Sequence, residues 1–366
     1  MRPTVSVAAV TALMMLAAAL MSTPLASAAD GKPAVAKPDA KPATKASVKA
    51  EPKAAEAPAG PFMGEYEGTF TPGSGAAVKA IAKVFGLPKD LYGVVLILPA
   101  AKEGEKETRL ALQGKADGET KLVISGKVGD AEWNGTLEKQ QLVVEAKGEK
   151  GGKFDLKSCV RKSPTEGKKP PQGAVVLLPF EEGKETNLDA WTNKNWKLLP
   201  DGSAQVNKGD SLTVKEFGDV ELHVEFTIPY MPTAAKLGRG NSGVYIQDRY
   251  EMQILDSFGV APQKSDCGSI YTQTAPKADA CLPPLRWQTY DITFHAPRLD
   301  AAGKVVKNVT VTMLFNGVKV HDNVEVPNPT GSARSKAPVK LAPLKLQDHG
   351  YPIRFRNVWL VELKGE

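Results

Sequence analysis

The chain has 366 residues, of which 42% are hydrophobic and 24% are charged, and its formal net charge at pH 7 is +6. This length is sufficient for two modest domains and additional terminal segments. Half of the positive excess lies in the first 60 positions, and the remainder of the chain is close to neutral. Composition therefore gives no indication of a polyanion-binding surface, and nucleic acid is not expected as a partner.

Residues 1–28 have the pattern of an export signal. Arg2 precedes an apolar run through Leu13 to Leu20, and the stretch ends in Ala26-Ser27-Ala28, a small-x-small cleavage pattern. The apolar run is too short for a retained membrane span. We therefore expect an exported protein, periplasmic or extracellular, with no membrane span after processing.

Residues 29–60 consist almost entirely of Ala, Lys and Pro with a few acidic residues, and no aromatic residue occurs among them. Such a segment cannot bury enough apolar surface to offset the entropy of ordering, so a disordered tether is expected. Its lysines have no interleaved aromatic side chains, which single-stranded nucleic acids would need for base stacking.

Residues 61–162 are expected to form a small separate β domain. Seven segments of alternating character recur at short spacing with Gly-containing turns, at 64–70, 92–98, 108–114, 121–128, 131–137, 141–147 and 153–159. This spacing is typical of an antiparallel meander or small barrel. One short helix is expected at 76–85. The segment lacks a cluster of His, Cys or paired carboxylates, so its role as a binding or spacer module is not specified.

Residues 163–173 are expected to be a linker, in which Pro170 and Pro171 stiffen the crossing. Strand patterns then follow quickly over residues 174–366. Residues 220–228 alternate strictly between apolar and polar side chains, and residues 309–323 form a hairpin pattern with Asn316-Gly317 at its turn. Because few helices interrupt this pattern, a two-sheet β-sandwich is the expected architecture. The expected fold class is therefore all-β.

Residues 240–259, GNSGVYIQDRYEMQILDSFG, place polar groups in alternation on two predicted strands. Side chains point alternately to the two faces of a strand, so one face would be apolar and the other polar. The polar positions are Tyr245, Gln247, Glu251 and Gln253. We expect this polar face to be the functional surface.

Three further segments accompany this pattern: CGSIY at 267–271, LRWQTYDITFHAPRLD at 285–300 and LQDHGYPIRFRNVWLVEL at 346–363. In this order, and together with 240–259, they resemble the 3-keto-disaccharide hydrolase family, whose members act as 3-keto-α-glucoside-1,2-lyase and 3-keto-2-hydroxy-glucal-2-hydratase. The resemblance covers about Pro170 to Leu363. It implies a concanavalin A-like (lectin/glucanase) β-sandwich that acts on sugars oxidised at carbon 3, here preceded by an extra β unit.

The number of carboxylates on the predicted polar face limits the type of reaction. Retaining glycosidases need two carboxylates about 5 Å apart, and positions i and i+2 of a strand could supply them. Here these positions hold Glu251 and Gln253, and an amide neither attacks an anomeric carbon nor carries a proton. Asp256 is a third candidate carboxylate, but by simple alternation it faces the core unless a β-bulge turns it back. A 3-keto glycoside needs only one base, because the ketone acidifies the carbon 2 hydrogen and permits elimination followed by hydration.

We therefore expect Glu251 to act as the base and His349, in the loop LQDHG, as a second acid–base group. Recognition of sugar hydroxyl groups is assigned to six side chains, Asn241, Tyr245, Gln247, Gln253, Arg354 and Arg356. The two arginines would also suit the charge of an enolate. Glu251 and His349 are alternatively ligands of a divalent cation of unspecified identity. The simpler alternatives are a carboxylate paired with a sheet arginine and a turn-stabilising histidine.

The three cysteines leave two possibilities open. Cys267 and Cys281 flank a loop and could form a disulfide in an oxidising compartment, with Cys159 left over; alternatively all thiols are reduced. Outside the motif, His223 and Glu225 share one face of a strand, either as metal ligands or as a solvated face. A non-catalytic carbohydrate-binding module of a secreted or surface assembly is the alternative to an enzyme.

Overall fold

The computed structural model describes residues 60–364 except residues 101, 103, 104, 149, 332 and 334. In this part of the chain nearly every element is a strand, and the single helix is a short 3-10 turn, Lys236–Gly238. No helix within it is long and apolar enough to cross a membrane. The predicted export signal and all of the predicted tether except Gly60 lie outside the described residues.

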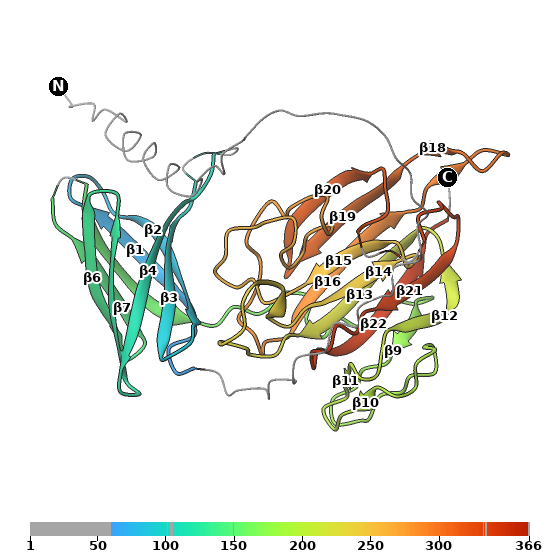
Figure 1. Cartoon of the computed structure of the whole chain (residues 1–366), viewed down its shortest axis with the longest axis horizontal. Coiled ribbons are helices and arrows are strands. Elements are labelled where there is room, and N and C mark those ends of the chain that lie inside the picture. The colour runs from blue at the N-terminus through green and yellow to red at the C-terminus, as the bar shows by residue number, and fades with distance from the viewer. Residues whose placement is uncertain are drawn as a thin grey trace, which may run out of the picture.

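The first eight strands form a closed antiparallel barrel, in which each strand pairs with the next and β1 pairs with β8 (Figure 1). The strands are β1 Gly64–Pro72, β2 Val78–Gly86, β3 Leu91–Leu98, β4 Thr108–Asp117, β5 Lys121–Val128, β6 Ala131–Glu138, β7 Gln141–Ala146 and β8 Gly152–Cys159. Its interior is filled by apolar side chains, among them Leu96, Leu122 and Phe154. The structure confirms the predicted antiparallel barrel.

The helix predicted at 76–85 is wrong, because this segment forms strand β2. Ala and Lys favour a helix in isolation, but pairing with β1 and β3 closes the barrel here and overrides that preference. The strand alternates: Ala82 and Val84 belong to the barrel core, whereas Lys83 and Phe85 point outward. These outward side chains contact the second half of the chain.

The second half of the chain contains two larger antiparallel sheets. The eight-stranded sheet has the order β10-β11-β22-β13-β16-β19-β20, with β9 paired to β22. Its strands are β9 Val175–Leu178, β10 Lys197–Leu198, β11 Ala204–Gln205, β13 Val220–Thr227, β16 Gln288–His295, β19 Val309–Phe315, β20 Val318–Val326 and β22 Arg354–Glu362. A separate two-stranded ribbon joins β17 Arg298–Leu299 to β18 Val305–Lys307.

The four-stranded sheet has the order β12-β21-β14-β15. Its strands are β12 Ser211–Phe217, β21 Ala342–Leu346, β14 Ser242–Ile246 and β15 Tyr250–Ile254. The turn between β14 and β15 has two residues with positive φ, Gln247 at 57° and Asp248 at 50°. Three residues separate the paired residues Ile246 and Tyr250, and the Arg249 amide closes the turn by donating to the Ile246 carbonyl at 3.2 Å.

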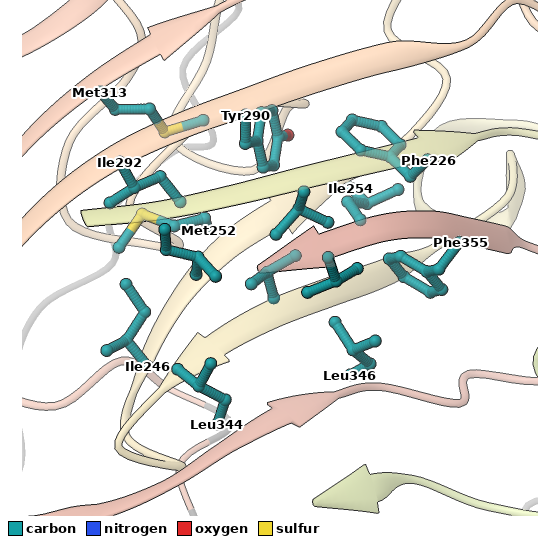
Figure 2. Close-up of a cluster of buried hydrophobic side chains, with 14 of the residues drawn as sticks. Phe226, Ile246, Met252, Ile254, Tyr290, Ile292, Met313, Leu344, Leu346 and Phe355 are labelled. Atoms are coloured by element: carbon teal, nitrogen blue, oxygen red, sulfur yellow. The ribbon is translucent and has the colours of Figure 1, made fainter. Parts of the chain in front are cut away.

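The two sheets pack face to face around one apolar core (Figure 2). Phe226, Tyr290 and Ile292 come from the eight-stranded sheet, and Met252 and Leu346 come from the four-stranded sheet. Each of these residues is at most 2% exposed. This packing confirms the all-β fold class and the two-sheet sandwich. The side chains that alternate with core residues on β14, β15 and β21 therefore lie on the outer face of the four-stranded sheet.

The segment that follows the barrel lies on the outer face of the eight-stranded sheet. The Ser163 hydroxyl is 2.6 Å from the hydroxyl of Thr289, and the Thr165 hydroxyl donates to Asp291 at 2.6 Å. The Gly167 amide donates to Glu225 at 2.5 Å. Side chains of the sheet therefore hold residues 163–167 against its outer face.

Beneath this segment is a buried ionic cluster. His223 is 1% exposed, with Nδ1 2.8 Å from Asp291 and Nε2 3.4 Å from Glu225. Glu225 also accepts a hydrogen bond from Nε of Arg356 at 2.7 Å. His223 and Glu225 thus do not form a solvated face, because both are buried and their polar atoms pair with each other and with neighbours.

We expect the stability of the protein to fall as the pH rises through the pKa of His223. Burial alone would lower this pKa, but Asp291 and Glu225 together raise it above its ordinary value of 6.5. The folded state therefore holds the proton more tightly, so the stabilisation is complete below pH 6.5 and is lost above the folded-state pKa. In His223→Gln, Tm should depend less on pH in this range. Parallel Tm curves for the two proteins would contradict this role.

Candidate functional site

The outer face of the four-stranded sheet carries a row of polar side chains from three adjacent strands. Tyr245 of β14 is paired with Glu251 of β15 on one side and with Lys345 of β21 on the other. Residues directly opposite each other in antiparallel strands have neighbouring side chains on the same face. Lys345, Tyr245 and Glu251, here called the polar row, are each at most 2% exposed. The predicted polar face therefore exists.

Lys345 occupies one end of the polar row. Its ammonium nitrogen is 2.6 Å from Asp248 and 4.0 Å from Asp210, and it lies 3.7 Å from the centroid of the Tyr245 ring. Two carboxylates thus compensate a buried positive charge, and a cation–π contact holds it against the ring. Sequence reasoning missed Lys345. The segment APLKL does carry a signal: in a strand its two leucines share one face, so the lysine between them lies on the opposite, polar face.

Tyr245 occupies the centre of the row. Its hydroxyl oxygen accepts a hydrogen bond from the side-chain amide of Gln347 at 3.1 Å. The backbone amide of Gln347 in turn donates to the carbonyl of Gly243 at 3.0 Å. The position of the phenol is therefore set by the residue that follows β21, which is itself bound to the backbone of β14. Gln347, the residue before Asp348 and His349, is a further residue of the site that the sequence pattern alone does not predict.

Glu251 occupies the other end and lies above Gly243 of the neighbouring strand. A β-carbon added at Gly243 would be 2.6 Å from Oε1 and 3.0 Å from Cγ of Glu251. Any side chain at Gly243 would therefore displace the carboxylate. The backbone of Glu251 is fixed as well, because its carbonyl accepts a hydrogen bond from Tyr271 at 3.0 Å and its amide donates to Thr330 at 3.3 Å.

The segment 268–271 of the CGSIY motif borders β15, and we call it the edge segment. The Gln253 amide donates to the Ser269 carbonyl at 3.0 Å, and the Gly268 amide donates to the Gln253 carbonyl at 2.9 Å. The side-chain amide of Gln253 donates to the Ser265 carbonyl at 3.3 Å. The edge segment thereby continues the sheet beyond β15, next to Glu251 and Gln253.

Two other predicted recognition residues have mainly structural surroundings. Gln247, in the turn after β14, donates its side-chain amide to the carbonyls of Phe217 at 3.2 Å and Lys340 at 2.9 Å. This amide therefore ties the turn to β12 and to the segment before β21. Asn241 is 5% exposed and immediately precedes β14. The role in hydroxyl recognition stays a prediction for both.

His349 differs from Glu251 in its environment. It is exposed and stacks on Tyr351, with ring centroids 6.3 Å apart. Its loop is fixed by the neighbouring Asp348, whose carboxylate accepts a hydrogen bond from the Gly209 amide at 2.7 Å and whose amide donates to Asp210 at 2.9 Å. His349 is therefore not part of the buried polar row.

These surroundings do not fit the divalent cation expected at Glu251 and His349. Among the residues that the structure describes, no group of three or more His, Cys, Asp or Glu side chains is placed to hold a metal ion. One candidate ligand is buried, and the other is an exposed loop residue. No catalytic step is therefore assigned to a cation.

The arginines predicted to join Glu251 lie on the other side of the sandwich. Arg354 and Arg356 belong to β22, in the eight-stranded sheet, and point away from the core. Arg356 is bound by Glu225 and by Glu166 at 3.1 Å, and Arg354 is 3.2 Å from Asp201. The prediction that they join Glu251 is wrong, because alternation predicts the face of a strand but not the sheet that the strand joins.

Cys267 and Cys281 are buried neighbours, and all three cysteines are free thiols in this structure. Burial, followed by the nearby Cys267 thiol, raises the pKa of Cys281 well above its ordinary value. Burial and then Glu67 are the main causes that raise the pKa of Cys159 to about 11. The proximity of Cys267 and Cys281 is compatible with pairing, which stays a prediction.

A comparison with known protein families identifies the second half of the chain. Residues 174–361, just over half of the sequence, match the family described as 3-keto-alpha-glucoside-1,2-lyase-like domain. The chain belongs to this family. The match covers both sheets of the sandwich and the polar row, and it excludes the barrel, so the domain is carbohydrate-active and the barrel is an addition to it.

Three similar solved structures are proteins of Parabacteroides distasonis ATCC 8503 that are provisionally described as glycosyl hydrolases. The first is 34% identical with a TM-score of 0.46, over 53% of this chain and 85% of the other. The second is 21% identical with a TM-score of 0.35, over 48% and 95%. The third is 18% identical with a TM-score of 0.37, over 50% and 92%. No curated protein matches the chain.

Proposed function

We propose that this protein is an exported enzyme that cleaves 3-keto glycosides by elimination and then hydrates the product, with net hydrolysis. The observation that carries the proposal is the polar row, in which one carboxylate, one phenol and one ammonium group share a buried sheet face. Membership in the 3-keto-alpha-glucoside-1,2-lyase-like family supports the choice of substrate class.

In the first half-reaction Glu251 is the base. Its carboxylate takes the proton from carbon 2, which the adjacent ketone acidifies. The electron pair of that C–H bond forms the double bond between carbons 1 and 2, and the bond from carbon 1 to the glycosidic oxygen breaks. The leaving oxygen takes a proton from solvent water, because the carbon 2 proton stays on Glu251. The products are an alcohol or sugar and a 2-hydroxy-3-keto-glucal.

In the second half-reaction the glucal takes up water. The water oxygen bonds to carbon 1 and releases one proton to solvent, and carbon 2 receives its proton from protonated Glu251. The sum of the two steps is hydrolysis. Because the same group removes and returns the proton at carbon 2, one carboxylate is sufficient, in agreement with an amide at position 253.

Charge that develops on the ketone oxygen needs fixed donors on the same face. We assign this role to Tyr245, whose hydroxyl is oriented by Gln347 and whose ring is held by Lys345. Lys345 is already compensated by Asp248 and Asp210, so it acts mainly by fixing the ring and supplying a positive potential. This assignment replaces the one made for Arg354 and Arg356.

A carbon 2 label tests the mechanism. A 3-keto glucoside with deuterium at carbon 2 should lose the label to solvent during turnover, because Glu251 exchanges its proton with water between the two steps. Mass spectrometry of the released 3-keto sugar, corrected for exchange of that sugar without enzyme, measures the loss. Full retention of deuterium would contradict this exchange, and detection of free 2-hydroxy-3-keto-glucal during turnover would then separate return of the same deuteron from direct displacement at carbon 1.

Export is part of the same proposal and is supported by the pattern of residues 1–28. The substrate would then be met in the periplasm or outside the cell. A carbohydrate-binding module, the alternative from another class, would bind the sugar without releasing a product, so the labelled substrate would be recovered intact.

A further inference from the structure

The barrel contacts the sandwich through the outer face of β2. Phe85 packs against the apolar core of the sandwich, and a β-carbon added at Gly259 would be 2.6 Å from its ring. The ammonium group of Lys83 lies 5.1 Å from the centroid of the Phe258 ring. Phe258 and Gly259 lie four and five residues after the last residue of β15, so β2 contacts the segment that follows the strand carrying Glu251.

A buried ion pair accompanies this apolar contact. Lys83 is 4% exposed, and its ammonium nitrogen is 2.9 Å from the carboxylate of Asp279. It also donates to the backbone carbonyls of Asp279 at 3.2 Å and Cys281 at 3.4 Å. Arg109 of β4 is 3.1 Å from the other carboxylate oxygen of Asp279 and donates to the Gly259 carbonyl at 2.8 Å.

A third cation extends the contact. Arg161, just after β8, donates to both carboxylate oxygens of Glu65, at 3.1 and 2.9 Å, and reaches the Ala280 carbonyl at 3.4 Å. Residues 279–281 of the sandwich are therefore held from the barrel by Lys83, Arg109 and Arg161. Burying such charges is costly unless every group is compensated, so this surface is built for a permanent contact rather than for a flexible spacer.

The held segment leads back to the polar row. Residues 267–281 form one loop, and its first part contains the edge segment beside β15. At the start of this loop the Cys267 amide donates to the Ser257 hydroxyl at 3.2 Å, and the Cys267 sulfur is 3.2 Å from the Tyr290 hydroxyl. The Tyr290 hydroxyl accepts from the Gly268 amide at 2.8 Å and donates to the Gln253 carbonyl.

We infer that the barrel is a buttress of the functional site: Lys83 and Arg109 fix residues 279–281 and thereby keep the edge segment against β15 at Glu251 and Gln253. Lys83 is a positioning residue, because it acts through Asp279 and the loop. The structural part of this inference is independent of the reaction. Only its catalytic consequence rests on the proposed function.

Hydrogen exchange in the full chain tests the structural part. In Lys83→Met the ammonium group is lost while most of the side-chain length remains, and Asp279 loses a buried partner. Amides of the edge segment, such as those of Gly268 and Tyr271, should exchange about tenfold faster or more. The control is Lys79→Met, which changes an exposed lysine on the same strand and should leave this exchange unchanged.

Asp279→Asn is the second variant, because it retains the shape of the side chain and keeps the test decisive if Lys83→Met does not fold. It should accelerate exchange in the same amides. Exchange within about twofold of the wild-type protein in the folded variants would overturn the buttress, since local opening of the loop would then be independent of the ion pair.

Kinetics test the catalytic consequence. With a 3-keto glucoside, Lys83→Met should lower kcat about tenfold through misplacement of β15 and the edge segment, with a smaller effect on KM. Unchanged kcat together with accelerated exchange would mean that the barrel holds the edge segment without contributing to catalysis. If the wild-type protein itself does not turn over 3-keto glucosides, the proposed function fails, and hydrogen exchange still decides whether the barrel holds the loop.

Discussion

Glu251→Gln is expected to lower the turnover of a 3-keto glucoside by about 10² to 10⁴ while the protein folds normally. The amide has the shape of the carboxylate, so the space above Gly243 stays filled. It cannot accept the proton from carbon 2, and elimination loses its base. The measurement is kcat for the purified variant, with circular dichroism and Tm to show that the fold is retained.

Glu216→Gln is the matched control, since Glu216 is an exposed carboxylate on β12 of the same sheet. It should have wild-type kcat. A near wild-type rate for Glu251→Gln would mean that another group is the base, whereas an equal loss in both variants would point to an effect on the whole sheet.

Lys345→Met is expected to destabilise the protein by about 3 to 5 kcal/mol, because it leaves the carboxylates of Asp248 and Asp210 beside a buried apolar side chain. It should also lower kcat, since the ring of Tyr245 loses the cation that holds it. Denaturant unfolding measures the first effect, and kinetics on a 3-keto glucoside measure the second.

Lys215→Met is the control for this variant, because Lys215 lies on the same sheet and is 56% exposed in its pair with Glu362. It should change the unfolding free energy by less than about 1 kcal/mol. In the double variant Lys345→Met, Asp248→Asn one uncompensated charge is removed, so part of the stability should return. Unfolding of Lys345→Met at the wild-type denaturant concentration would contradict the importance of the buried pair.

The fold was largely predictable because most strands alternate with period 2 and are separated by turn residues. Strand β2 was not predictable in this way. Its Ala and Lys residues favour a helix, and only closure of the barrel between β1 and β3 makes the segment extended. Residues 163–167 likewise have a polar, linker-like composition, yet the hydroxyls and carboxylates of the eight-stranded sheet bind them.

The candidate site was predictable in part, for a related reason. Alternation placed Tyr245 and Glu251 on one face, and the register of β14 with β15 makes them neighbours. The strand that completes the row could not be found from local pattern, because β21 lies about 90 positions further along the chain and pairs through long-range contacts. The wrong prediction for Arg354 and Arg356 has the same cause, because local pattern does not show which sheet a strand joins.

The most direct test of the central claim is a comparison of turnover on a 3-keto glucoside and on its unoxidised parent glucoside by the full-length protein. Without the ketone the carbon 2 hydrogen is far too weakly acidic for one carboxylate to remove. The expected result is therefore product release from the 3-keto glucoside alone, with loss of that activity in Glu251→Gln. Cleavage of the parent glucoside at a comparable rate would contradict elimination and indicate an ordinary glycoside hydrolase.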